Sequence, residues 1–342
     1  MRLLTRAFGG AHATKDVDAI MRQALLATLD RDLDRAEQLL SRAVRIDSGD
    51  VEVFLALARL FRMRGEIGRA IRIHQNLLLR TDLDTDQRVE VVADLAADFQ
   101  QGGFIQRAIA SYEETLGHEP KHRVAMQALV RLYSEARDFE RAIAMARRLA
   151  RAKGENSNLV EAGLLVDMAD AARAEGRNSD ARKAAKRALR KDRGLVRGWI
   201  TLGELEAERG RTKAALAAWL QVPKIDRRSG SLVYPQLEAT FAALGRPRDF
   251  ERFLRELLGE KPDDLEARLA LARTLSARGE SDAATAEIRT VLDKDSDDLA
   301  ALAMLGRSLL AERRDGEANR LLAELLDSLD RRGLLHAAEP LV

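Results

Sequence analysis

Apolar residues recur along the chain at the spacing of amphipathic helices. Phe54, Leu57, Ala58 and Phe61 follow the i, i+3, i+4, i+7 pattern that places apolar side chains on one face of a helix. Such stretches recur along the sequence and are separated by short turns. The pattern therefore predicts helix–turn–helix pairs whose apolar faces pack against each other and against neighbouring pairs.

A small-residue signature marks the turn inside each pair and repeats along the chain. A glycine precedes an alanine by five residues at 65 and 70, 103 and 108, 176 and 181, 210 and 215, and 279 and 284. Gly245 pairs with Phe250 instead, and Arg31–Ala36, Arg137–Ala142 and Arg313–Ala318 fill three repeats without the glycine. The repeats start at 17, 51, 89, 123, 162, 196, 231, 265 and 299. Steps of about 34 residues are the period of the tetratricopeptide repeat. We therefore expect an all-α tetratricopeptide-repeat solenoid of about nine repeats, wound as a right-handed superhelix.

The residues that recur from repeat to repeat can be explained by the geometry of each helix pair. Glycine ends the first helix, where a left-handed residue avoids a Cβ clash. Small residues such as Ala58 and Gly203 let the second helix approach closely. Two of the distances between repeat starts, 51 to 89 and 123 to 162, exceed the usual 34 residues. The extra residues are polar and lie at Asp82–Asp86 and about 153–157, where we expect longer loops between repeats.

The repeats divide the chain into a solenoid and two ends. Residues 1–16 form an N-terminal extension, 17–329 the solenoid, and 330–342 a C-terminal cap or tail. The first eight residues are too short and too charged for a signal peptide, and no stretch approaches the roughly 18–20 apolar residues of a membrane helix. We expect a cytoplasmic protein whose contact with a membrane is indirect or peripheral to the inner membrane.

Composition and charge exclude several classes of function. The 342 residues include 57 Lys and Arg against 55 Asp and Glu, so the net charge of +2 gives no general reason to bind nucleic acid. The absence of cysteine excludes disulfides, thiolate catalysis and cysteine-ligated metal sites. Aromatic residues make up only 4%, which favours helices over sheets.

No catalytic constellation emerges from the motifs. Phosphate-binding, zinc-protease and serine-hydrolase signatures are absent from the sequence. His118 and His122 have a metal-like spacing, but Pro120 lies between them, so we interpret them as loop histidines, with a metal role as the alternative. His74 is expected to be a half-buried core residue with one hydrogen bond, with a titrating switch as the alternative. We expect no enzyme activity, no cofactor, no metal and no small-molecule substrate.

One helix carries a basic face, which we call the basic ridge. Its six residues recur at i, i+1, i+4, i+5, i+8 and i+9: Arg182, Lys183, Lys186, Arg187, Arg190 and Lys191. The ridge is either a solvated outer face or a docking surface for an acidic protein, anionic lipid or nucleic acid. Nucleic acid is the weakest of these because no aromatic side chains are interleaved for base stacking.

The first helices of the repeats should line a concave groove that binds protein partners. The candidate groove residues are the non-core positions of those helices: Glu52, Leu55, Arg59, Arg62, Met63, Glu90, Gln100, Arg197 and Glu204. Arg59 and Arg62 are the candidate anchors for carboxylates of a partner, with ordinary surface charge as the alternative.

The segment from Leu60 to Leu77, LFRMRGEIGRAIRIHQNL, carries more than the repeat consensus. Its core, Arg64-Gly65-Glu66 followed by Arg69 to Gln75, resembles the second repeat of the lipopolysaccharide assembly protein B family. The likeness continues through Gln87-Arg88, and the layout of the repeats is similar over about 17–326.

The resemblance implies a non-enzymatic adaptor at the cytoplasmic face of the inner membrane. Such proteins are thought to bring the deacetylase that commits lipid A synthesis to a membrane-bound AAA protease. The family usually begins with a membrane-spanning helix and ends with a rubredoxin-like metal domain of two C-x-x-C pairs. This sequence contains neither an apolar stretch long enough for such a helix nor a C-x-x-C pair, so the resemblance does not imply metal binding here. The sequence fits either a chain trimmed at both ends or a shorter relative.

The leading interpretation is thus a tetratricopeptide adaptor in the control of lipopolysaccharide synthesis. The alternatives are a general scaffold for another bacterial protein complex, and a module that binds anionic lipid or nucleic acid through the basic ridge. The apolar last helix, with Leu321, Leu322, Leu325 and Leu326, either packs on the preceding repeat or allows a homodimer to form end to end.

Overall fold

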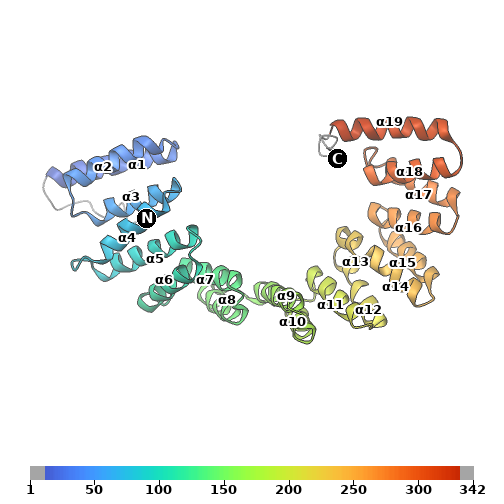
Figure 1. Ribbon diagram of the computed structural model, residues 1–342, viewed down its shortest axis with the longest axis horizontal. Coiled ribbons are helices and arrows are strands. Elements are labelled where there is room, and N and C mark those ends of the chain that lie inside the picture. The colour runs from blue at the N-terminus through green and yellow to red at the C-terminus, as the bar shows by residue number, and fades with distance from the viewer. Residues whose placement is uncertain (1–11, 332–342) are drawn as a thin grey trace. The chain divides into compact units, whose positions relative to one another are not determined.

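The computed structural model describes residues 12–331, and these residues fold into helices without a strand. The expected tetratricopeptide fold is confirmed (Figure 1). The chain divides into two compact halves, one ending at Met168 and one beginning at Ala169. We call them the N-terminal half and the C-terminal half. The predicted extension and tail lie largely outside the described residues, although His12 already starts a helix and the last helix ends at Arg331.

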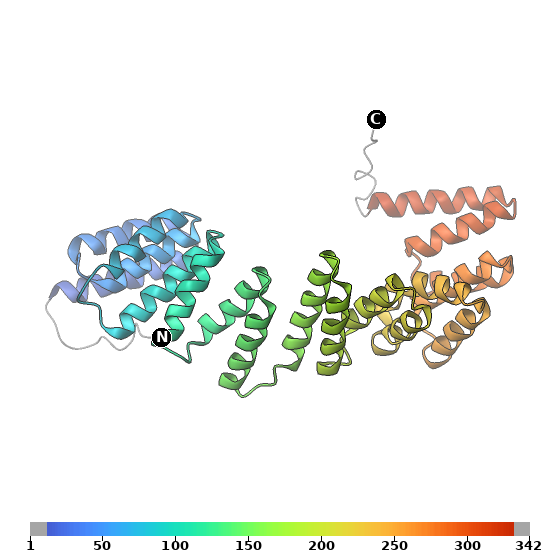
Figure 2. The same cartoon turned by 60° about the horizontal axis from the view of Figure 1, so that its bottom comes forward.

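The N-terminal half consists of successive helical hairpins. Figure 2 shows the antiparallel pairing of α7 with α8. The helices are α1 (His12–Leu29), α2 (Leu33–Ile46), α3 (Val51–Met63), α4 (Ile67–Leu78), α5 (Thr85–Gln101), α6 (Ile105–His118), α7 (Arg123–Glu135) and α8 (Phe139–Lys153), and α9 (Asn158–Ala174) crosses the boundary between the halves.

The C-terminal half continues with the same kind of hairpin and has one irregular stretch. Its elements are α10 (Asn178–Lys191), α11 (Val196–Glu208), α12 (Thr212–Trp219), α13 (Val222–Ile225), the 3₁₀ helix η2 (Arg227–Leu232), α14 (Tyr234–Ala243), α15 (Pro247–Glu260), α16 (Leu265–Ala277), α17 (Ser281–Leu292), α18 (Leu299–Ala311) and α19 (Asp315–Arg331). Pro223 and Pro235 stand in the first turns of α13 and α14. Because proline donates no backbone hydrogen bond, it starts helices there instead of continuing them.

The turn between the two helices of each repeat has the same backbone geometry. The predicted glycines, such as Gly65 with φ +79°, all adopt the left-handed conformation. The three repeats without glycine use it too, with Arg31, Arg137 and Arg313 at φ of 57–61°. In every repeat the next N–H donates to the carbonyl five residues back, as Glu66 does to Phe61 at 2.8 Å. This is the Schellman end of a helix, in which a left-handed residue satisfies the last free carbonyl groups.

Both inserted segments lengthen the helix that follows them, and the first also lengthens its loop, which spans the six residues 79–84 against four at 119–122 and at 154–157. Both α5 and α9 have 17 residues, whereas α3 and α7 have 13. At α5 the Asp84 side chain accepts a hydrogen bond from the Gln87 N–H at 2.7 Å, and the Gln87 side chain accepts one from the Asp84 N–H. This capping box begins the helix one turn early. The expectation of a longer loop at Asp82–Asp86 was therefore wrong for Thr85 and Asp86.

Small residues on both helices bring each hairpin together. The alanines at 36, 70, 108, 142, 181, 215, 284 and 318 are at most 1% exposed, and Phe250 takes the same position with 1% exposed. Gly203 shows how close the approach is, because a Cβ placed there would overlap the indole ring of Trp219. Gly306 is different: its nearest side-chain atom, Cδ2 of Leu321, lies 3.6 Å from where a Cβ would stand.

The core of each half is apolar and built from both helices of the repeats. In the C-terminal half Tyr234, Leu237, Phe250 and Leu254 are fully buried together. Leu321 of α19 packs against the core of α16 and α18, while Leu326 is 53% exposed. No helix within residues 12–331 combines the length and apolarity needed to cross a membrane.

The two glycines give a matched test of close packing. We expect Gly203→Ala to lower the free energy of unfolding by about 1–3 kcal/mol, because the added methyl group must displace Trp219. Gly306→Ala should be neutral or stabilise by up to about 1 kcal/mol, because alanine loses less backbone entropy than glycine in a helix. Urea denaturation followed by circular dichroism measures both. Equal effects of the two substitutions would contradict this account of the hairpin.

Candidate protein-binding groove

A groove of about 860 Å³ lies in the N-terminal half and is lined mainly by the first helices of repeats two and three, which are α3 and α5. From α7, Val124 alone lines it. The lining residues are Met21, Val51, Glu52, Leu55, Ala56, Arg59, Arg62, Asp84, Asp86, Gln87, Val89, Glu90, Ala93, Asp94, Ala97, Tyr112, Glu119, His122 and Val124. This is the place at which the sequence predicts a protein-binding surface.

The groove brings together five of the nine predicted groove residues. They are Glu52, Leu55, Arg59, Arg62 and Glu90. Two others from the same helices do not line it. Met63 at the end of α3 is 59% exposed, and Gln100 on α5 accepts a hydrogen bond from the Tyr112 hydroxyl at 3.3 Å.

The last two predicted groove residues lie in the C-terminal half and make ion pairs there. The Arg197 guanidinium group donates to Asp170 at 2.6 Å, and Glu204 accepts a hydrogen bond from Arg173. Neither lines the groove of the N-terminal half. Their part in partner binding stays a prediction.

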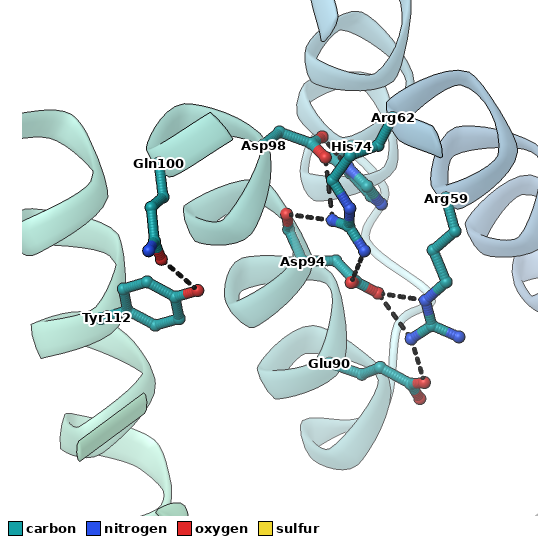
Figure 3. A network of polar contacts seen from close by, with 8 residues as sticks. All are labelled: Arg59, Arg62, His74, Glu90, Asp94, Asp98, Gln100 and Tyr112. Carbon is teal, nitrogen blue, oxygen red and sulfur yellow. Dashed lines mark hydrogen bonds and ion pairs between the residues drawn. The ribbon is translucent and has the colours of Figure 1, made fainter. Parts of the chain in front are cut away.

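Arg59 and Arg62 extend from α3 to carboxylates on α5, as Figure 3 shows. Arg59 donates to Asp94 and Glu90, both at 2.7 Å. Arg62 donates to Asp94 at 3.0 Å, to Asp98 at 2.9 Å and to the backbone carbonyl of Asp94 at 3.0 Å. The two predicted anchors thus hold repeats two and three together, and their charges are largely satisfied within the chain.

His74 completes this network from α4. Its side chain is fully buried, and its Nδ1 lies 2.5 Å from Oδ2 of Asp98, whose other oxygen accepts from Arg62. Among the described residues, none provides a hydrogen-bond partner for His74 Nε2. His74 is therefore more deeply buried than the sequence pattern suggests, and it connects three helices through one carboxylate.

The arginines set the charge state of the central carboxylate. Burial raises the pKa of Asp94, but the neighbouring Arg59 and Arg62 outweigh burial and hold the pKa below its ordinary value. The same pairing raises the pKa of Arg59 despite burial. Asp94 is 9% exposed, so its ion pairs are less screened by solvent than pairs on the open surface.

Sequence reasoning missed most of the acidic lining, including Asp84, Asp86, Asp94 and Glu119. One signal was available: acidic residues recur at 90, 94 and 98, which places them on one face of α5. Their pairing with Arg59 and Arg62 depends on how α3 packs against α5. That packing is not readable from either helix alone.

The two histidines with metal-like spacing lie at a helix junction. His118 ends α6, and Nδ1 of His122 accepts the Ala125 N–H at 3.1 Å as the N-cap of α7. His122 thus caps a helix. Within residues 12–331 no group of three or more histidine, aspartate and glutamate side chains is arranged to hold a metal ion.

The basic ridge on α10 is partly paired within the chain. Arg182 donates to the buried Glu206, and Nζ of Lys183 lies 3.4 Å from Asp180. Arg187 and Lys191 also have partners. Lys186 and Arg190 instead line a pocket of about 660 Å³ with Arg193, Leu189, Trp199, Leu202, Gln221 and Ile225. Of these lining residues, none is acidic.

Comparison with known families agrees with the repeat pattern. Two family models described as tetratricopeptide repeat match residues 242–306 and 166–225. Both matches fall in repeats that the glycine and alanine signature also identifies.

Curated relatives give a more specific similarity. Lipopolysaccharide assembly protein B of Escherichia coli K12 is 29% identical over 256 residues, which is 75% of this chain and 65% of the relative. The protein of that name from Haemophilus influenzae is 28% identical over 238 residues, 69% of this chain and 59% of the relative. The chain thus spans less than two thirds of these relatives. The chain has the tetratricopeptide-repeat fold and is similar in sequence to lipopolysaccharide assembly protein B.

Solved structures with similar folds are more distant. A Naa15/Naa10 complex bound to HypK-THB contains a chain with 15% identity and a TM-score of 0.42, covering 86% of this chain and 46% of that chain. The C-terminal part of a repeat protein from Cytophaga hutchinsonii has 11% identity and a TM-score of 0.44, covering 83% and 99%. These overlaps add nothing to the repeat assignment.

The ion pairs of Asp94 predict a pH-dependent contribution to stability. Asp94→Asn should lower the free energy of unfolding by about 1–3 kcal/mol at neutral pH, because two arginines lose a charged acceptor. The folded-state pKa of Asp94 is lowered, so its stabilisation is present above the unfolded pKa and is lost as pH falls through the folded value. The difference between the two proteins should therefore shrink below about pH 4.

Urea denaturation of both proteins from pH 7 downwards measures this difference. Asp82→Asn is the matched control, because Asp82 pairs with Arg80 at an exposed site. A constant difference between the wild type and Asp94→Asn at all pH values would show that Asp94 acts by shape rather than by charge.

Proposed function

We propose that this chain is a non-enzymatic adaptor in the control of lipopolysaccharide synthesis. Its groove binds a protein client, and the client is the deacetylase of lipid A synthesis, which the adaptor presents to a membrane AAA protease. The observation that carries the proposal is the similarity to lipopolysaccharide assembly protein B over 256 residues. That match covers 75% of this chain, so it extends over several repeats.

The groove supports a binding role rather than a catalytic one. Its central carboxylates are held in ion pairs with Arg59 and Arg62, and the pKa of Asp94 is lowered. A general acid or base at neutral pH needs a pKa shifted towards 7. An arginine-paired carboxylate with a lowered pKa fits an architectural role better.

The mechanism of such an adaptor is effective concentration. A scaffold that holds a client beside a processing enzyme makes their encounter intramolecular, so the rate rises without a new chemical step. A repeat solenoid suits this task because successive repeats offer an extended surface for more than one partner.

The pocket beside the basic ridge favours a second candidate function, which is binding of an anionic lipid headgroup. Lys186, Arg190 and Arg193 line this pocket together with apolar residues that include Leu189 and Trp199. A phosphate group with an attached apolar portion matches both parts of this lining. Peripheral binding of this kind would bring the chain close to membrane-bound partners.

Affinity capture tests the adaptor function. Full-length tagged chain is incubated with detergent-solubilised membranes and lysate of its source bacterium, and captured proteins are identified by mass spectrometry. We expect enrichment of the lipid A deacetylase and the AAA protease. Ala97→Trp fills the groove and should reduce capture of the client at least about fivefold, since a bulky side chain removes contact area across the groove.

Ala110→Trp is the control, because Ala110 is exposed on α6 and does not line the groove. Equal loss with both variants would point to a folding defect. Enrichment of neither expected protein would contradict the role in lipid A control.

Vesicle binding tests the lipid function. We expect the chain to sediment with vesicles that contain phosphatidylglycerol and not with pure phosphatidylcholine vesicles. Replacing Lys186, Arg190 and Arg193 with glutamine should weaken binding at least about tenfold, because each basic residue near an anionic surface contributes about 1 kcal/mol. A matched variant replaces the exposed Arg209, Lys261 and Arg289 with glutamine. Equal weakening by the two variants would indicate net charge alone and contradict a pocket.

A further inference from the structure

We infer that the groove of the N-terminal half takes a basic, extended segment of its partner, not an acidic one. The inference rests on the proposed function, since it assumes that the groove binds a protein. It specifies the chemistry of the bound segment, which the relatives' names do not. Arg59 and Arg62 considered alone predict a partner segment with negative charge, whereas we infer a segment with positive charge.

The cations of the groove are already committed to partners within the chain. Arg59 is 2.7 Å from Glu90 and 2.5 Å from Asp94, and Arg62 is 3.0 Å from Asp94 and 2.9 Å from Asp98. Figure 3 shows both guanidinium groups directed at α5. A partner carboxylate would have to displace one of these pairs before it could bind, so the arginines make poor anchors for an acidic segment.

The groove lining as a whole, with paired and unpaired side chains counted together, has a negative net charge. Two arginines line it, and so do six carboxylates: Glu52, Asp84, Asp86, Glu90, Asp94 and Glu119. With His122 neutral the lining has a net charge of 2 − 6 = −4. An acidic segment would enter a field of its own sign, whereas lysine and arginine side chains would be attracted.

The acids of the lining stand on different elements of the groove. Asp86 stands in the first turn of α5, whereas Glu119 directly follows α6, and both are exposed. The lining also includes small or apolar side chains that are not fully buried, among them Ala93, Ala97 and Val124, and Val124 is 66% exposed. A segment in which basic and small apolar residues alternate would match both kinds of lining.

Direct binding of model peptides tests this inference on the full chain. The probes are a short, dye-labelled peptide of lysine, leucine and glycine, and the same peptide with every lysine replaced by glutamate. Fluorescence anisotropy should show at least tenfold tighter binding of the lysine peptide at about 0.03 M salt, where the Debye length exceeds 10 Å. Binding should weaken as salt rises towards about 0.3 M.

A charge-neutralised groove localises the effect. Asp86→Asn combined with Glu119→Gln leaves the arginine network intact and should weaken binding of the lysine peptide about fivefold, as two exposed ion pairs would. Glu114→Gln combined with Glu140→Gln removes the same charge from exposed positions that do not line the groove, and should leave binding within about twofold.

Two outcomes overturn the inference. One is tighter binding of the glutamate peptide, and the other is equal weakening by the groove variant and its control. Failure here is distinguishable from failure of the adaptor function. If the client is captured through the groove while the lysine peptide does not bind, only the polarity is wrong. If the lysine peptide binds in the groove and no expected client is captured, only the client is wrong.

Discussion

Each repeat depends on a sharp reversal of the backbone after its first helix. The residue at the reversal must adopt a left-handed conformation, and only then can the following N–H reach the carbonyl five residues back. This bond fixes where the second helix starts and brings the buried alanine, such as Ala70, against the first helix. The shape of the groove follows, because the turn sets how the first helices of neighbouring repeats align. For non-glycine residues this conformation costs about 1–2 kcal/mol, and Arg31, Arg137 and Arg313 pay that cost in three repeats.

Much of the fold could be read from the sequence because its determinants are local. The glycine–alanine spacing identifies the turn in five of the nine repeats and so fixes the phase of the others, and the helix that begins at Val51 falls where that phase puts it. The early start of α5 was missed because a capping box depends on two side chains, Asp84 and Gln87, that look like loop residues in isolation. The repeat pattern also did not predict that α12 ends at Trp219 and is followed by the short elements α13 and η2. Pro223 and Pro235, which start α13 and α14, were the available signal.

The candidate site was less predictable because its charge depends on ion pairs between side chains of different helices. Five of the predicted groove residues do line the groove. Leu55 was expected at a non-core position, but it is 2% exposed and belongs to the core with Val51, Leu77 and Val91. The chemistry of the groove was misjudged, because Arg59 and Arg62 were considered without the acids that face them from α5. The charge of a solenoid surface is a property of neighbouring repeats together, and a single helix shows only half of each ion pair.

The buried contact between His74 and Asp98 distinguishes repeats two and three from the others. Tetratricopeptide repeats share a common packing scheme, and such modules can in principle be duplicated, deleted or exchanged during evolution. Replacing α3 or α4 by its counterpart from another repeat would remove one partner of the buried Asp98 carboxylate, and replacing α5 would remove the carboxylate itself. We therefore expect exchange of a single repeat at this place to destabilise the fold more than an exchange at a junction without such a network.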